Sequence, residues 1–161
     1  MSTKPTDIAT GLEGLAKVVG NTDYSGGKIG TEAVCFEWVM PNEAKSGKPK
    51  IAIVLIADSL VSQDEGIERR KAELNISATW VHDKSDTRQH QHAALESMRL
   101  AIAVRDAIKK AMKDPDGNGI SGLTLIEHAE TGIEPRGHKD KDRVGWVGQT
   151  WFAHYHRAID Y

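Results

Sequence analysis

Three stretches of the chain show the apolar pattern of β-strands: Ala33 to Met40, Ile51 to Ala57 and Leu74 to Trp80. The first and third alternate apolar and polar residues, which predicts strands with one face buried and one face in water. The second is apolar throughout and rich in β-branched residues, so we expect a central strand that is covered on both faces. Two more predicted strands, Leu123 to Glu130 and Trp146 to Ile159, close the chain.

Two other segments repeat apolar residues at helical spacing. The first helix is predicted to begin after Thr6 or Asp7 and to end at Gly20-Asn21. Its two internal glycines each weaken it by about 1 kcal/mol relative to alanine, so we expect it to depend on docking to the sheet. The second helix is predicted from about Arg88 to Lys113. Its predicted apolar stripe consists of Leu95, Met98, Ala101, Ile102, Val104, Ile108 and Met112.

The predicted order is helix, three strands, helix, two strands. This order favours an α+β fold: a mixed, mainly antiparallel sheet packed against a long helix and a short amino-terminal helix. The 161 residues suit one domain, residues 1–161. We place Trp80 and Ile102 in its core.

Composition narrows the classes of function. The chain has 21 basic and 23 acidic side chains, a balance that gives no support to a general nucleic-acid or membrane-surface role. Its single cysteine, Cys35, cannot form an internal disulfide, and residues 1–10 lack the pattern of a signal peptide. We therefore expect a reducing compartment and, with no apolar run near 20 residues, no membrane span.

The histidines raise the question of a metal site. His90 and His92 form one pair, and His154 and His156 form another that would share a strand face, within reach of His82. Neither pair has a third ligand at a diagnostic spacing. We therefore predict no enzyme, no catalytic residue, no metal and no cofactor, and keep a metal-dependent enzyme using His82, His154 and His156 as the lowest-ranked alternative.

Two further features favour ordinary structural roles. Asp114 to Gly119 resembles the opening of a calcium loop, but its twelfth position is Leu125 rather than glutamate, so we expect a turn. Cys35 lies inside an alternating strand pattern, which favours a small buried thiol over a nucleophile. The four tryptophans are expected in the core or at subunit interfaces, because no basic stripe accompanies them.

The connection from Thr131 to Gly145 is long and highly charged. We predict a loop there, and because long loops in small domains are often functional, we assign it to assembly. The candidate assembly residues are Arg136, His138, Lys139, Asp140, Lys141, Asp142 and Arg143.

Several segments together suggest a family. They are the strands Pro49-Lys-Ile-Ala-Ile-Val and Ala72-Glu-Leu-Asn-Ile-Ser-Ala-Thr-Trp, the helix Ala93 to Met112, Gly122-Leu-Thr-Leu-Ile-Glu, and Val147-Gly-Gln-Thr-Trp-Phe-Ala-His-Tyr. In this order, from Ile51 to Ile159, the chain resembles the tail-terminator, or tail-completion, proteins of long-tailed bacteriophages and related particles.

The resemblance implies a structural virion protein. Its subunits would form a ring, commonly a hexamer, that caps the tail tube, ends tube polymerisation and joins tail to head. The implied partners are further copies of the chain, the tail tube protein and a head-tail connector or neck protein, with DNA passing through the lumen without sequence specificity and no membrane. The implied location is the head-proximal end of the tail, after synthesis in the host cytoplasm. Another head-tail connector, head-completion or tail-tube component remains the alternative.

Overall fold

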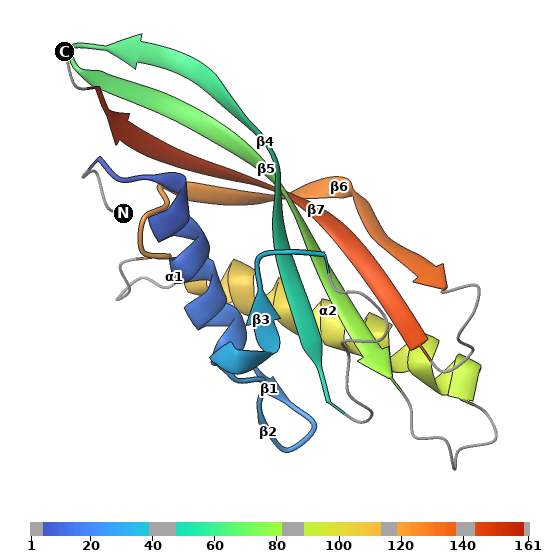
Figure 1. Cartoon of the computed structure of the whole chain (residues 1–161). Helices are drawn as coiled ribbons and strands as arrows, with labels where there is room; N and C mark the ends of the chain where they lie inside the picture. The colour runs from blue at the N-terminus through green and yellow to red at the C-terminus, as the bar shows by residue number, and fades with distance from the viewer. Residues whose placement is uncertain (1–4, 39–47, 82–88, 114–118, 138–143, 160–161) are drawn as a thin grey trace.

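The computed structural model describes residues 5–38, 48–81, 89–113, 119–137 and 144–159 (Figure 1). Its helical elements are α1 (Ile8–Gly20), the 3₁₀ turn η1 (Thr31–Ala33) and α2 (Gln89–Lys113). Its strands are β1 (Asp23–Tyr24), β2 (Gly27–Lys28), β3 (Val34–Cys35), β4 (Lys50–Asp64), β5 (Ile67–Val81), β6 (Leu125–Gly137) and β7 (Val144–Ala158). The predicted α+β class is confirmed.

Five strands form the main sheet, in the order β3-β4-β5-β7-β6. The short strand β3 runs parallel to β4, and every other neighbouring pair in this sheet is antiparallel. Strands β1 and β2 form a separate two-stranded hairpin. The prediction of a mixed, mainly antiparallel sheet is therefore confirmed.

Both helices pack on one face of the sheet and bury a shared core with it (Figure 1). Its fully buried large side chains include Leu15 of α1, Leu100 and Ile108 of α2, and Ile53, Leu74, Ile76 and Trp151 of the sheet. One buried amide also links the layers: Gln149 donates to the Ala101 carbonyl oxygen at 3.0 Å and accepts from the Trp151 indole at 3.1 Å. Among the described residues, no helix is long and apolar enough to cross a membrane.

Helix α1 begins as predicted, because the Asp7 carboxylate accepts a hydrogen bond from the Thr10 backbone N–H at 2.7 Å. Gly14 explains why this helix tolerates glycine. A Cβ at Gly14 would lie 2.3 Å from the carbonyl oxygen of Ser121, so a larger residue would push the helix away from its neighbouring segment. The close contact supplies the docking that the weak helix needs.

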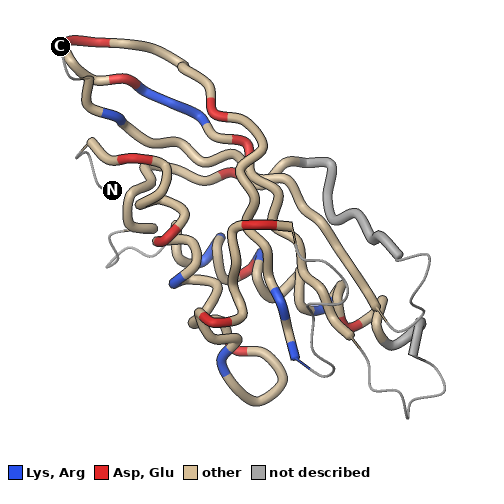
Figure 2. Tube along the Cα trace, in the orientation of Figure 1, with Lys and Arg blue, Asp and Glu red and all other residues tan. Residues whose placement is uncertain are grey.

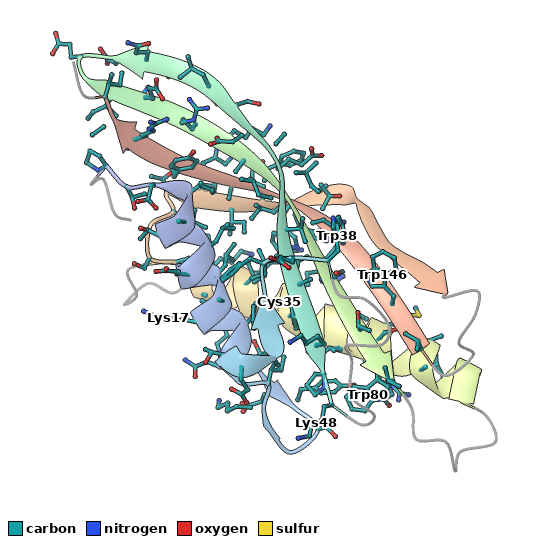
Figure 3. All side chains as sticks on the ribbon, viewed as in Figure 1. Lys17, Cys35, Trp38, Lys48, Trp80 and Trp146 are labelled. Carbon is teal, nitrogen blue, oxygen red and sulfur yellow. The ribbon has the colours of Figure 1, made fainter. Side chains whose placement is uncertain are left out.

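The predicted strand from Ala33 to Met40 is wrong in its length. Only Val34 and Cys35 pair with β4, and the chain bends at Phe36 and Glu37, while residues 39–40 lie outside the described part. Trp38 instead packs edge to face on Trp146 of β7, with 6.0 Å between ring centroids (Figure 3). Trp38 therefore packs against the face of the sheet that the helices do not cover, and it does not continue a strand.

The predicted polar connection from Asp58 to Arg70 is also wrong, because these residues continue β4 and β5. The two strands stay paired to Asp64 and Ile67, where Glu65 and Gly66 turn the chain with positive φ values. The expected full coverage of Ile51 to Ala57 holds only through Val54. Polar residues are compatible with this pairing because water can solvate a strand that the helices do not reach.

Helix α2 carries apolar residues on two faces, and only one of them is buried. Leu100, Ala101, Val104 and Ile108 face the sheet, whereas Leu95, Met98 and Ile102 are exposed. The predicted single stripe joined both faces, and the placement of Ile102 in the core is therefore wrong. The placement of Trp80 in the core is confirmed, since it is 9% exposed.

Candidate functional site

The predicted assembly loop is largely a β-hairpin. Strand β6 continues to Gly137, and the backbone of Arg136 pairs with Trp146 of β7. Pro135 has no backbone N–H, but β6 lies at the sheet edge, where a residue whose N–H would face solvent needs no hydrogen-bond partner in the sheet. The remaining candidates, His138, Lys139, Asp140, Lys141, Asp142 and Arg143, lie outside the described residues. The expectation of one long loop from Thr131 to Gly145 is therefore wrong.

The proposed histidine ligands are only partly described. His154 Nε2 lies 3.4 Å from Glu127 Oε1, a separation typical of a loose ion pair, and it makes no geometrically sound hydrogen bond. His82 lies outside the described residues, as do the side chains of His90 and His92. Among the described side chains, no three histidine, cysteine or acidic groups lie close enough to hold a metal ion.

The other two candidates are Cys35 and the calcium-like segment, and neither is assigned a reactive or binding role. Cys35 is half-buried, and its Sγ lies 3.3 Å from the Glu37 carbonyl oxygen and 3.6 Å from that of Ile51. Both contacts suit a thiol that donates to the backbone. Most of the calcium-like segment, residues 114–118, lies outside the described part of the chain.

A cavity of about 660 Å³ lies beside the β1–β2 hairpin. Tyr24 and Trp80 meet edge to face at its wall, with 5.8 Å between ring centroids, and Lys48 lies nearby (Figure 3). Lys28 also lines it, but its Nζ lies 2.8 Å from a carboxylate oxygen of Asp23. We assign the cavity no ligand, because one lysine is already paired and Lys48 is exposed at the surface.

The most distinctive part of the molecule is the arm, which we define as residues 55–73 of β4 and β5 together with residues 152–158 of β7. These three strands extend past the helices as a twisted sheet (Figure 1). Strand β3 covers the outer edge of β4 only at Ile51 and Ala52. No other described strand pairs with that edge farther along the arm.

A polar network fastens the three strands of the arm together. Arg70 of β5 contacts Asp58 of β4 at 3.2 Å and Glu68 at 2.9 Å. The Tyr155 hydroxyl of β7 donates a short hydrogen bond to the other Asp58 oxygen. Burial, followed by this hydrogen bond, raises the pKa of Tyr155 to about 12. The network therefore links the three strands to one another, and Tyr155 connects it to the core that the sheet shares with the helices.

The outer edge of the arm is apolar. Two β-bulges interrupt β4, one between Leu55 and Ala57 and one between Leu60 and Ser62. The apolar residues at these bulges form what we call the arm patch: Leu55, Ile56, Leu60 and Val61. Leu60 and Val61 are 51% and 59% exposed, so large apolar side chains occupy positions where a soluble edge strand usually carries charge.

A second exposed apolar surface lies on the outer face of α2. Leu95, Met98 and Ile102 follow the spacing of one helical stripe, on the side opposite the buried residues, and we call them the α2 stripe. Leu95, the most exposed of the three, is 48% exposed. The arm patch and the α2 stripe come from different elements and are the candidate functional surfaces of this chain.

The charges around the two surfaces differ in sign. Residues 55–66 contain three acidic residues and no basic one, while β5 places Arg69, Arg70 and Lys71 opposite Ser62, Leu60 and Ser59. Residues 55–73 together contain five acidic and three basic residues (Figure 2). Residues 95–113 of α2 contain five basic and two acidic residues. The bases Arg99, Arg105 and Lys109 lie within one or two turns of the α2 stripe.

Sequence reasoning did not identify either surface as functional. The α2 stripe was assigned to the core, and the strand that carries the arm patch was divided between a buried strand and a polar connection. The one available signal was the absence of basic residues from residue 55 to residue 66. Comparison of the chain with protein-family models and with curated proteins finds no match.

Proposed function

We propose that this chain is a structural subunit of a tailed phage or phage-like particle. In this role it forms a ring that caps the tail tube, ends tube polymerisation and joins the tail to the head. The observation that carries the proposal is the arm. A polar network links its three strands, and its outer strand, β4, exposes four large apolar side chains. Contiguous exposed apolar patches commonly mark sites of contact with other proteins.

The order of elements also supports the proposal. From β4 onward, two paired strands, the long helix α2 and two more paired strands follow one another along the chain. This is the order on which the resemblance to tail-terminator proteins rests.

The test uses the tail tube protein encoded in the same genome. Purified chain is added at increasing ratios while the tube protein polymerises, and tubes are measured by electron microscopy. A tail terminator shortens the tubes as its concentration rises and forms a visible ring at one end. Tubes of unchanged length and without an end structure would refute the proposal.

The same images separate the alternative particle roles. A tail-tube component would be incorporated along the whole tube, and labelled chain would then decorate its length. A head-completion or connector protein would leave tube length unchanged and would bind at the portal end of isolated heads. Labelled chain confined to one tube end supports the terminator role.

A further inference from the structure

We infer that copies of this chain bind one another through two different surfaces: the arm patch of one copy covers the α2 stripe of the next copy. The inference rests on the proposed function, because a ring needs one contact that repeats around it. It adds the two surfaces that make that contact.

The two surfaces are different and lie on separate parts of the molecule. The arm patch belongs to β4 beyond the helices, whereas the α2 stripe lies on the side of α2 that faces away from the sheet (Figure 1). A chain whose two complementary surfaces differ makes heterologous contacts, and such contacts close into a ring when the rotation between copies allows it. A self-complementary patch would instead give a two-fold dimer.

Charge complementarity favours a second copy as the partner. The arm patch is followed by Asp64 and Glu65 at the tip, whereas the α2 stripe is flanked by Arg99, Arg105 and Lys109. Arg99 and Arg105 already form ion pairs with Glu96 at 2.8 Å and with Asp106 at 3.3 Å, so the basic excess of this part of α2 comes from Lys109, Lys110 and Lys113. Opposite charges around apolar centres orient two surfaces and speed their encounter.

The bulges indicate that side chains, rather than backbone groups, make this contact. A strand added edge to edge needs a regular row of N–H and C=O groups, and bulges at Ile56 and Val61 interrupt that row. The residues at these bulges include exposed apolar side chains, and Val61 lines a shallow hollow with Arg70 and Tyr155 that another chain's side chains can enter. A helix face accepts such side chains without needing backbone register, which the α2 stripe provides.

The test uses two single variants of the full chain, Val61→Lys in the arm patch and Ile102→Lys in the α2 stripe. Both sites are exposed, so circular dichroism should show wild-type folding. The control is Glu13→Lys, an exposed position on α1 that belongs to neither surface. Self-association is measured by sedimentation velocity over a range of protein concentrations. Each variant should weaken association by at least about tenfold, and the control should not.

Mixing the two variants tests the direction of the contact. A Val61→Lys copy retains its α2 stripe, and an Ile102→Lys copy retains its arm patch, so one contact can form between them. The mixture should contain dimers but no larger species, while each variant alone stays monomeric. A mixture that stays monomeric would overturn the head-to-tail pairing.

The outcomes separate this inference from the proposed function. Variants that assemble as well as wild type would overturn the inference, while capping of tail tubes by the wild-type chain would still support the ring role. A wild-type chain that neither self-associates nor caps tubes would overturn both. If Val61→Lys lost association while Ile102→Lys associated as well as wild type, the inference would also be overturned. The surface that binds the arm patch would then lie outside the α2 stripe.

Discussion

Strands β4, β5 and β7 pass through two different environments in this molecule. Near the helices their inward side chains, such as Leu74 and Trp151, are fully buried against α1 and α2. In the arm the same strands remain paired, but Leu60 and Val61 are exposed and the inward side carries Arg70 with its carboxylates. The comparison shows that strand pairing continues well beyond the apolar core.

The two environments also differ in what stabilises them. The helix-covered half is stabilised by apolar burial, a large term that ionic screening does not weaken. The arm depends on backbone pairing and on one half-buried ion network, terms that are modest in water. We therefore expect the covered half to dominate the free energy of unfolding, and the arm to dominate contacts with other chains.

The largest expected difference in the free energy of unfolding comes from replacing one leucine by alanine in each half of the sheet. Leu74→Ala should lower the free energy of unfolding by about 2 to 5 kcal/mol, because it leaves a cavity in the core. Leu60→Ala should lower it by less than about 1 kcal/mol, because this side chain is already half in water. Urea denaturation of both variants measures the difference. Equal losses would show that the arm patch is packed within its own chain.

The two faces of α2 allow the same comparison on a helix. Ile108→Ala should cost about 2 to 5 kcal/mol, since Ile108 is fully buried. Ile102→Ala should cost less than about 1 kcal/mol in the monomer, which reverses the sequence-based expectation that Ile102 belongs to the core. Thermal unfolding at low protein concentration measures both. A large loss at Ile102 would restore the original placement.

The two faces of α2 also show where sequence patterns were sufficient and where they were not. Helical periodicity located α2 and some of its buried residues, such as Val104 and Ile108, which recur at the spacing of one helix face, but it missed the fully buried Leu100. It could not separate Ile102 from them, since hydrophobicity is the same whether a residue faces the sheet or a partner. The face that is covered depends on tertiary packing, which the periodicity does not contain.

The strands illustrate the same limit. Alternation located Leu74 to Trp80 as a strand, but the expected water-facing side is wrong at Ser77 and Thr79, which are buried. Ser59, Ser62 and Asp64 resemble loop residues unless their pairing with β5 is known. In β6, the length and charge of the segment from Thr131 favoured a loop, because the pattern did not show that these residues pair with β7 at a sheet edge. Of the candidate residues chosen for their charge, Arg136 therefore has its backbone in β6, and the others lie outside the described residues.

A smaller effect is expected in the ion network of the arm. Arg70→Met should lower the free energy of unfolding by roughly 1 to 2 kcal/mol, between the values for exposed and buried ion pairs. Asp58 and Glu68 would then share a partly buried site without their cation. Hydrogen exchange should increase in residues 55–73 and remain unchanged in α2.

The control for this variant is Arg69→Met, which removes an exposed cation from the adjacent position. It should change the free energy of unfolding by less than about 0.5 kcal/mol. If Arg69→Met and Arg70→Met had the same effect, the network would contribute nothing specific to the arm. Faster exchange in α2 as well would indicate that the arm and the core unfold as one unit.

The last expected effect is a pH dependence, which is confined to the range above pH 10. Burial and the hydrogen bond to Asp58 raise the pKa of Tyr155 from 10.0 to about 12, so the folded chain retains this proton after the unfolded chain has lost it. The stabilisation is fully present below pH 10 and is lost as pH rises toward 12. Tyr155→Phe removes this titration, and its stability should therefore fall less than that of wild type between pH 10 and pH 12.

Tyr24 provides the matching measurement in the helix-covered half. Its hydroxyl donates to a carboxylate oxygen of Glu96 on α2, and burial, followed by this hydrogen bond, raises its pKa. Tyr24→Phe should therefore also flatten the loss of stability above pH 10, but without changing hydrogen exchange in the arm. Denaturant midpoints measured at several pH values compare the two variants with wild type. If the Tyr155→Phe curve ran parallel to that of wild type, the Tyr155 hydroxyl would not retain its proton in the folded arm, and the contact with Asp58 would not be what fastens β7 to β4.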